Sequence, residues 1–554
     1  FMDYMQRYDV WRRKATDAEV RRQLDEMQGD EKRIQDCFYK DLEFGTAGQR
    51  GVLGAGTNCR NVYTVSKTTQ GLADYLGANK ATKVFISYDS RINSKLFAET
   101  AARVLAQNGI TAYITKELQP TPFVSFGTRE MRCDAGIMIT ASHNPSKFNG
   151  YKVYGADGCQ ITDEAAALIT AAIEKVDPFD VRPSGFDEAF AAGLIQYVPD
   201  EVYAEFLNRV KKQHLRDCGD IKITYSPLNG TGWKFVPEIL KEIGVKNLNI
   251  VREQYEPDGN FPTCPYPNPE KKEALSLGLK YAAEADSDLF IATDPDADRV
   301  GVAVKHGGGY VILTGNEMGL CLLSYLLEER SARGTLPARP VVVKTIVTTN
   351  LAEKIAAKYG AETRNVLTGF KYIGDQMNRL AADGRIDDFI MGYEESCGYL
   401  VGDHARDKDA VVACMVLAEC ADSLKAKGMT LVDKLNAIYD EFGRYSHRTI
   451  SKEFAGASGS ARMKELLDAF RAADVKEVGG KKVLEKIDLL GKNVLGLPSS
   501  NVIILNLEDN AQLIVRPSGT EPLIKFYMTA AESLEKNNEV FAEMSEYIDG
   551  FFTA

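Results

Sequence analysis

Three aspartates stand at alternate positions in the segment TDPDADRVG, directly after a short apolar run. A pair of such carboxylates 4 Å apart would repel by about 4 kcal/mol at an effective dielectric of 20. A divalent cation removes this repulsion, and oxygen ligands favour a hard ion, Mg²⁺ or Ca²⁺. An EF-hand calcium loop fails here, because it needs glycine and glutamate where this chain has Arg299 and Lys305. We therefore predict a metal site at Asp294, Asp296 and Asp298, in preference to a solvated acidic turn.

A serine and a histidine stand side by side in TASHNPSKFNG, which follows the apolar run AGIMI. A hydrolase nucleophile elbow would read G-x-S-x-G, whereas the flanking residues here are Thr140 and Asn144. His143 is the next residue along the chain, which we judge a poor placement for activating Ser142 through its own ring. We expect the metal to coordinate the serine oxygen instead. A plain turn beginning with Asn-Pro is the alternative for this motif taken alone.

Further polar loops could bind the two ends of a phosphorylated sugar. GYEESCGY places Glu394 and Ser396 on a glycine-flanked loop that suits sugar hydroxyls, with a solvated acidic turn as the alternative. FGTAGQRG carries Arg50 and HARDKDA carries Lys408, although surface charge is the default interpretation of each. RPSGTEP combines a guanidinium, hydroxyls and backbone N–H groups, which suit a phosphate monoester better than a carboxylate, with a plain hairpin turn as the alternative; its candidate residues are Arg516, Ser518, Gly519 and Thr520.

The composition excludes several classes of protein. The 554 residues are 44% hydrophobic and carry a formal net charge of −11, which argues against binding to nucleic acid or to an anionic membrane. The ten cysteines include no C-x-x-C pair, which favours free thiols in a reducing cytoplasm over disulfides or zinc. No apolar stretch approaches the roughly 18 residues of a membrane span, and the charged residues 1–40 do not resemble a signal peptide. We expect a cytoplasmic protein.

The elements that must position these clusters form three successive series of apolar strands and amphipathic helices. This alternation predicts α/β layers with largely parallel sheets. Each series ends in one polar cluster at the carboxyl end of a strand, where such sheets gather their functional groups. The predicted strands are 83–88, 111–115, 135–141, 221–226, 247–251, 289–292, 341–347 and 389–391, and the predicted helices are 94–109, 232–244, 273–285, 351–359 and 371–383. After about residue 441, a smaller α+β domain is indicated by strands at 501–506, 511–516 and 523–529 and a helix at 533–549.

Seven motifs in order resemble the α-D-phosphohexomutase superfamily, and within it the phosphoglucomutases of the phosphopentomutase-related branch: FGTAGQRG, TASHNPSKFNGYKVY, DPDADR, TGFK, GYEES, RDKDA and RPSGTEP. They span nearly the whole chain. The resemblance implies four domains around a central cleft, three of them related α/β domains with mixed, largely parallel sheets, and the last an α+β domain. We expect phosphoserine, metal-binding, sugar-binding and phosphate-binding domains at 1–212, 213–332, 333–440 and 441–554.

The resemblance also implies a role for each candidate residue. Ser142 would carry the phosphoryl group and share Mg²⁺ with the three aspartates, and Arg299 would contact that group. Thr368 would lie near the substrate, Glu394 and Ser396 would bind sugar hydroxyls, and the RPSGTEP residues would bind the phosphate that is not transferred. Four more residues would line the reacting centre, two of them alternative proton carriers (His143, Lys152) and two of them cationic (Arg50, Lys408).

The implied activity is that of an isomerase that interconverts α-D-glucose 1-phosphate and glucose 6-phosphate. Its phosphoserine would act through glucose 1,6-bisphosphate, which is both intermediate and activator. The Glu-Glu-Ser sequence favours glucose, while mannose or pentose phosphates, or synthesis of glucose 1,6-bisphosphate, stay open as alternatives. A serine hydrolase or phosphatase is disfavoured by the missing elbow glycines, and a non-catalytic sugar-phosphate sensor by the retained catalytic positions.

Two positions depart from the family pattern. Gln49 stands where an apolar residue is commoner before the arginine, and Cys397 stands where phenylalanine is often found. Neither departure removes a catalytic group. The expected partner is a phosphosugar, with no nucleic acid and no membrane, and both a monomer and a dimer are compatible with the sequence.

Overall fold

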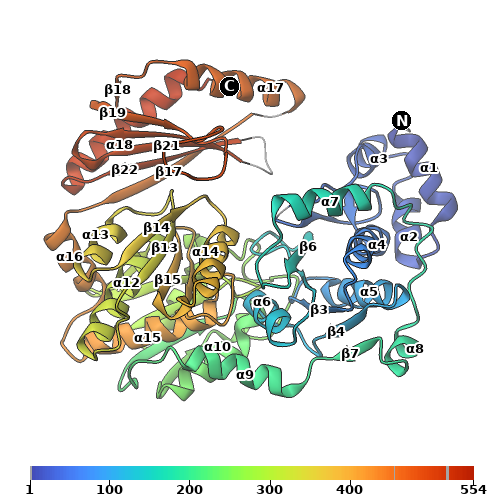
Figure 1. Ribbon diagram of the computed structural model, residues 1–554, viewed down its shortest axis with the longest axis horizontal. Helices are drawn as coiled ribbons and strands as arrows, with labels where there is room; N and C mark the ends of the chain where they lie inside the picture. Colours follow the sequence, from blue (N-terminus) through green and yellow to red (C-terminus); the bar gives the residue numbers. More distant parts are fainter. Residues whose placement is uncertain (1–2, 46, 455, 519–522, 554) are drawn as a thin grey trace.

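The computed structural model describes residues 3–45, 47–454, 456–518 and 523–553 (Figure 1). Within them lie four β-sheets, each built from one continuous part of the chain. The first three are mixed sheets with helices between their strands, and the fourth is antiparallel throughout. The expected architecture of three α/β domains and a C-terminal α+β domain is therefore confirmed.

The first sheet has the strand order β2-β1-β6-β5-β3-β4-β7. Strands β3 and β5 lie at its centre and are buried along almost their whole length, as expected for apolar strands covered by helices on both faces. Its strands are β1 (Gln49–Leu53), β2 (Cys59–Arg60), β3 (Lys83–Tyr88), β4 (Thr111–Ile114), β5 (Ala135–Ile139), β6 (Phe148–Gly155) and β7 (Ile195–Tyr197). Its helices are α4 (Val62–Ala78), α5 (Ser94–Gln107), α6 (Thr121–Glu130), α7 (Asp163–Ile173), α8 (Phe186–Ala191) and α9 (Asp200–Lys211).

Three short helices precede this sheet: α1 (Tyr4–Lys14), α2 (Ala18–Glu26) and α3 (Glu31–Phe38). They lie at the outer side of the first domain in Figure 1, and their buried residues form a small core of their own. Trp11 is central to it, because its ring packs edge-on against Phe38, Tyr63 and Phe179. This aromatic cluster fastens the N-terminal helices to the first domain.

The second and third domains follow the same plan. The second contains β8 (Lys222–Ser226), β9 (Asn247–Ile250), β10 (Leu289–Thr293), β11 (Val300–His306), β12 (Gly309–Leu313), α10 (Phe235–Glu242), α11 (Lys272–Glu284), α12 (Gly315–Ala332) and short 3-10 helices at Thr231–Trp233 and Arg252–Gln254. The third contains β13 (Val341–Thr345), β14 (Glu362–Val366), β15 (Phe389–Glu394), β16 (Gly398–Val401), α13 (Leu351–Lys358), α14 (Phe370–Ala382), α15 (Ala410–Lys425), α16 (Leu431–Phe442) and a 3-10 helix at Ile386–Asp388. In both, an antiparallel strand returns directly after the strand that ends in the predicted site residues.

The C-terminal domain has the strand order β17-β22-β21-β20-β19-β18. It comprises β17 (Ser446–Glu453), β18 (Glu477–Val478), β19 (Lys481–Asp488), β20 (Ile503–Leu507), β21 (Gln512–Pro517), β22 (Leu523–Ala530), α17 (Gly456–Ala472), α18 (Leu534–Phe551) and a 3-10 turn at Glu508–Asn510. Figure 1 shows it above the third domain. Apolar residues of both domains, such as Val347 and Ile514, share one small buried cluster, which joins the two domains.

One large core runs through the first three domains. It includes Phe123 of α6, Phe206 of α9, Phe235 of α10 and Tyr393 of β15. Helix α15 is buried from Ala410 to Leu424, as expected for a helix that is apolar on all sides. The first three domains are therefore packed as one body, and the domain bounds expected from the sequence stay a prediction. All ten cysteines are free thiols, and no helix among the described residues combines the length and apolarity needed to cross a membrane.

Candidate active site

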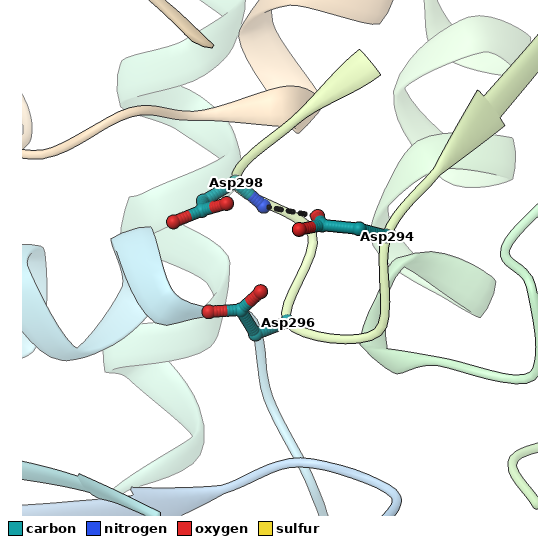
Figure 2. A group of neighbouring side chains, drawn as sticks. All are labelled: Asp294, Asp296 and Asp298. Atoms are coloured by element: carbon teal, nitrogen blue, oxygen red, sulfur yellow. Dashed lines mark hydrogen bonds between the residues drawn. The ribbon is translucent and has the colours of Figure 1, made fainter. Parts of the chain in front are cut away.

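The three aspartates lie on the turn that connects β10 to β11, and their carboxylates face one another (Figure 2). One oxygen from each lies within 4.8 Å of the others, and all three residues are buried. The turn is tight: Ala297 has a φ of 50°, and its N–H donates to Asp294 O at 2.9 Å. Oδ1 of Asp294 accepts the N–H groups of Asp298 and Arg299, both at 3.1 Å, which fixes its side chain. The backbone of the turn thus brings the three aspartates together and fixes the side chain of Asp294.

The three carboxylates differ in their surroundings. Burial, and then the charges of Asp296 and Asp298, raise the pKa of Asp294 well above its usual range. Burial alone would also raise the pKa of Asp296, but Lys152 and a hydrogen bond from Thr121 outweigh it and hold this pKa below its usual range. Among the described residues, Oδ1 of Asp296 and of Asp298 is buried without a hydrogen-bond partner. Buried carboxylate oxygens without hydrogen-bond donors are what a bound cation would satisfy, so this cluster could hold a metal ion.

Ser142 lies on the turn between β5 and β6, at the carboxyl end of a central strand. Its φ of 53° is unusual for a residue with a side chain. Its Oγ lies 3.5 Å from Asp294 Oδ2 and 3.2 Å from His143 Nδ1. The structure therefore brings serine and metal cluster together as predicted. The ring of His143 lies within hydrogen-bond distance of the serine oxygen, although the sequence made it a poor placement for activating Ser142.

Arg91, which sequence reasoning missed, holds this turn in place. Its two terminal nitrogens donate to four carbonyl oxygens, those of Ser142 and Asn144 at 2.6 Å, Pro145 at 3.0 Å and Phe148 at 3.1 Å. The buried Asp89 lies 3.3 Å from Arg91 and completes the arrangement. The available signal was YDSR at 88–91, a charged pair directly after a buried strand.

Two lysines approach the aspartates from different domains. Lys152 Nζ in β6 donates to Asp296 Oδ2 at 2.9 Å and lies 3.8 Å from Asp298 Oδ2. Lys408 Nζ, which precedes α15, lies 3.3 Å from Asp298 Oδ2 and donates to Asp407 at 3.1 Å. Burial would lower the pKa of Lys408, but the charges of these two aspartates and of Glu394 outweigh it and raise the pKa. Both predicted cations therefore belong to the site and keep the aspartate charge partly balanced.

The GYEES loop of the third domain meets the metal turn through Arg299. The side chain of Arg299 forms an ion pair with Glu270 at 2.8 Å, a contact that sequence reasoning missed, and donates to Ser396 O at 3.3 Å. Glu394 is buried, which raises its pKa, and its Oε1 accepts the N–H of Gly369 at 3.1 Å. Thr368 stands one residue earlier, and its hydroxyl is buried without a partner among the described residues.

The remaining predicted residues are Arg50 and those of the C-terminal RPSGTEP motif, and two of the latter lie outside the described residues. Arg50 in β1 donates to Asn144 Oδ1 at 3.0 Å, which links it to the Ser142 turn. Arg516 is the last residue but one of β21, and its Nη1 donates to Tyr527 Oη at 3.2 Å. Burial, then the charge of Glu395, raises the pKa of Tyr527 to about 12, so this strand end faces the third domain. Ser518 follows directly, whereas Gly519 and Thr520 lie outside the described residues.

The chain is similar to known proteins over most of its length. Phosphoglucomutase of Staphylococcus saprophyticus is 37% identical over 517 residues, which cover 90% of this chain and 92% of that protein. Parafusin, a phosphoglucomutase from Paramecium solved in its open form, superposes with a TM-score of 0.66 at 17% identity, covering 92% of this chain and 94% of that one. N-acetylphosphoglucosamine mutase of Aspergillus fumigatus, solved with GlcNAc-6P and magnesium, superposes with a TM-score of 0.51 at 15% identity, covering 97% and 100%.

Models of four family domains match successive parts of the chain. They are alpha/beta/alpha domains I, II and III and the C-terminal domain of phosphoglucomutase/phosphomannomutase, matched at residues 41–179, 201–308, 314–442 and 461–546. With the serine, the aspartates and the two lysines assembled as described, the conclusion is that the chain belongs to the phosphoglucomutase/phosphomannomutase family.

Proposed function

We propose that this protein is a phosphoglucomutase that interconverts α-D-glucose 1-phosphate and glucose 6-phosphate. Family membership, with phosphoglucomutases among relatives of similar length, supports this class of reaction. The observation that carries the proposal is the position of Ser142 Oγ, 3.5 Å from Asp294 Oδ2 at the junction of two domains. A hydroxyl held beside a buried carboxylate cluster and two lysines is suited to carry a phosphoryl group.

Mg²⁺ is the ion that we propose for the aspartate cluster. Asp294, Asp296 and Asp298 would hold it, together with an oxygen of phosphorylated Ser142. The donor set fits, because it is made of oxygen atoms only, and two buried carboxylate oxygens have no hydrogen-bond partner among the described residues. When bound, the ion supplies positive charge that stabilises the phosphoryl group during its transfer. The magnesium in the Aspergillus fumigatus enzyme supports this choice.

The chain's own residues have separable tasks in the transfer. The bond between phosphorus and Ser142 Oγ breaks as a bond to the sugar hydroxyl oxygen forms, and the hydroxyl proton moves to Ser142 Oγ. His143 is placed to carry this proton, because its Nδ1 lies 3.2 Å from Ser142 Oγ. Lys152, Lys408 and Arg299 orient the phosphoryl oxygens and offset their charge. In the second transfer the phosphoryl group at the other end of the sugar moves back to Ser142 Oγ, which regenerates phosphoserine and releases the isomer.

Glucose 1,6-bisphosphate is the proposed intermediate and activator, since the sugar carries phosphate at both ends between the two transfers. Glu394 and Ser396 would bind sugar hydroxyls, with Thr368 nearby. The far phosphate would bind at Arg516, Ser518, Gly519 and Thr520. A cytoplasmic location and a monomeric or dimeric state stay predictions.

The test is a comparison of substrates with a phosphorylated preparation of the protein. Glucose, mannose, ribose and N-acetylglucosamine 1-phosphates would be supplied with Mg²⁺ and a trace of the matching bisphosphate, and isomer formation and free phosphate would both be measured. We expect the highest kcat/KM for glucose 1-phosphate and no steady release of phosphate. A preference for another sugar would overturn the assigned substrate, and phosphate release without isomer would overturn the reaction.

A further inference from the structure

A buried arginine lies on the edge strand β2 of the first sheet, next to the strands that carry two of the proposed active-site cations, Arg50 in β1 and Lys152 in β6. Arg60 in β2 is 1% exposed, and its Nη2 donates to Gln49 Oε1 at 3.1 Å. Its guanidinium carbon lies 6.0 Å from the centroid of the Tyr151 ring. Among the described residues, Nε and Nη1 of Arg60 have no hydrogen-bond partner, and no carboxylate balances its charge. Gln49 is thus the side chain that accepts a hydrogen bond from this buried cation.

An unpaired buried charge normally destabilises a protein. Burial lowers the pKa of Arg60 to about 10, so the guanidinium is still charged at neutral pH. Gln49 is held on both sides of its amide: Oε1 also accepts from Thr68 Oγ1 at 2.7 Å, and Nε2 donates to Leu42 O at 3.2 Å. Gln49, which departs from the family pattern, therefore has a specific partner. An apolar residue in its place would remove the side-chain oxygen that accepts the hydrogen bond of Arg60.

Alternation along β1 and β6 connects this buried pair to the active site. Gln49 is 4% exposed and faces Arg60, whereas the next residue, Arg50, is exposed and reaches Asn144 in the Ser142 turn. Tyr151 of β6 pairs in register with Gln49 and bonds Thr69 of α4, while the next residue, Lys152, reaches Asp296. A shift of the buried pair would therefore move Arg50, which follows Gln49 directly on β1, whereas Thr69 and Asp296 hold Tyr151 and Lys152 on β6 in place.

We propose that Gln49 and Arg60 act as a coupled positioning pair, in which Arg60, held by Gln49 and Tyr151, fixes β1 so that Arg50 meets the Ser142 turn. The proposal rests on the proposed function and adds a layer of residues that supports it. Neither residue touches substrate. Because the pair acts through Arg50, its effect on kcat should depend on the presence of Arg50. The effect of a purely structural pair would not.

The first experiment compares Gln49→Leu, Arg60→Met and the double variant. Each is assayed for kcat and KM with glucose 1-phosphate at a temperature well below its Tm. We expect Gln49→Leu to lower kcat on the order of tenfold with little change in KM, because the stranded guanidinium displaces β1. Arg60→Met should lose less, and the double variant should regain most of the kcat, since the two changes are coupled. Simple multiplication of the two single losses would overturn the proposal.

The second experiment repeats Gln49→Leu in an Arg50→Ala background. If Gln49 acts through Arg50, the added change should leave kcat within about twofold of Arg50→Ala alone. A full further loss would show a general structural effect and overturn the proposal. Gln254→Leu is the matched control, because Gln254 is equally buried and accepts a hydrogen bond from Ser226 in the second domain, at 2.6 Å. It should lower Tm without lowering kcat. Absence of mutase turnover in the unmodified protein would instead overturn the proposed function.

Discussion

At the scale of single residues, the aspartates of the β10–β11 turn differ in their hydrogen-bond partners and in their pKa, because their neighbours differ. Backbone N–H groups hold Asp294, whereas Lys152 and Thr121 hold Asp296 from the first domain, with the Thr121 hydroxyl at 2.7 Å. The pKa of Asp294 is raised and that of Asp296 is lowered, so Asp296 is the more firmly charged of the two. Its carboxylate is therefore the one we expect to matter most for binding a cation.

Asp296→Asn tests that expectation. The change removes one negative ligand and leaves Lys152 next to a neutral amide, so the Mg²⁺ concentration for half-maximal activity should rise at least ~10-fold. Titration of activity with Mg²⁺ measures this. Asp286→Asn is the control, because Asp286 is an exposed aspartate of the same domain that is paired only with lysines. An unchanged Mg²⁺ requirement in Asp296→Asn would remove this residue from the metal site.

Ser142→Ala tests the phosphoryl carrier. Only one oxygen atom is lost, so the fold should be intact by circular dichroism, while mutase turnover and the phosphate found by mass spectrometry on the 140–150 segment should both disappear. Ser146→Ala changes a serine of the same turn and should retain both. Turnover that survives in Ser142→Ala would mean that another group carries the phosphoryl.

At the scale of elements, periodicity predicted a series of strands and helices in each of the first three domains, but it missed helices such as α4 and α12 and the strands that return. Strands β6, β11 and β16 run antiparallel beside the strand that ends in each site. Their sequences follow directly on the polar turns, and the sequence analysis predicts no strand there. Arg91 was missed for a related reason, since its partners are main-chain carbonyls from a segment about fifty residues away, and backbone acceptors leave no trace in a sequence.

Arg91→Met would test how far this element depends on one side chain. The turn would lose four hydrogen bonds, and Asp89 would be left as a buried unpaired charge. We expect a loss of about 3 kcal/mol in unfolding free energy, and a fall in kcat at temperatures where the protein is folded. Arg103→Met is the comparison, because the side chain of Arg103 also donates to a carbonyl, that of Ser184, away from the site. Equal kcat in the two variants would contradict the assigned role.

At the scale of the whole molecule, the site exists only where domains meet. Asp296 receives bonds from the first domain, Tyr154 of the first domain donates to Asp407 of the third at 2.6 Å, and Arg299 of the second donates to Ser396 O of the third. A single sequence gives the order of such loops but not the packing that brings them together. The expectation that these loops share one cleft came from the resemblance to a family. In the C-terminal loop, Arg516 and Ser518 are the predicted residues that the structure describes.

The junction of the third and C-terminal domains should also respond to pH. Burial, and then the charge of Glu394, raise the pKa of Glu395 to about 7, and its Oε2 lies within 3.4 Å of the hydroxyls of Thr345 and Thr348. The folded protein therefore binds this proton more tightly than the unfolded chain does. Its stabilising effect is complete below the unfolded pKa near 4.5 and is lost as the pH rises through about 7.

Urea unfolding of the unmodified protein and of Glu395→Gln, at several pH values and constant ionic strength, would measure this linkage. The neutral amide cannot titrate, so the unmodified protein should lose about 2 kcal/mol relative to Glu395→Gln between pH 5 and pH 8. Glu362→Gln, which changes an exposed glutamate of the same domain, should show no comparable slope. A difference that grows in the opposite direction would mean that the folded state prefers the charged carboxylate. In that case Glu395 would have to be paired with a cation rather than buried near Glu394.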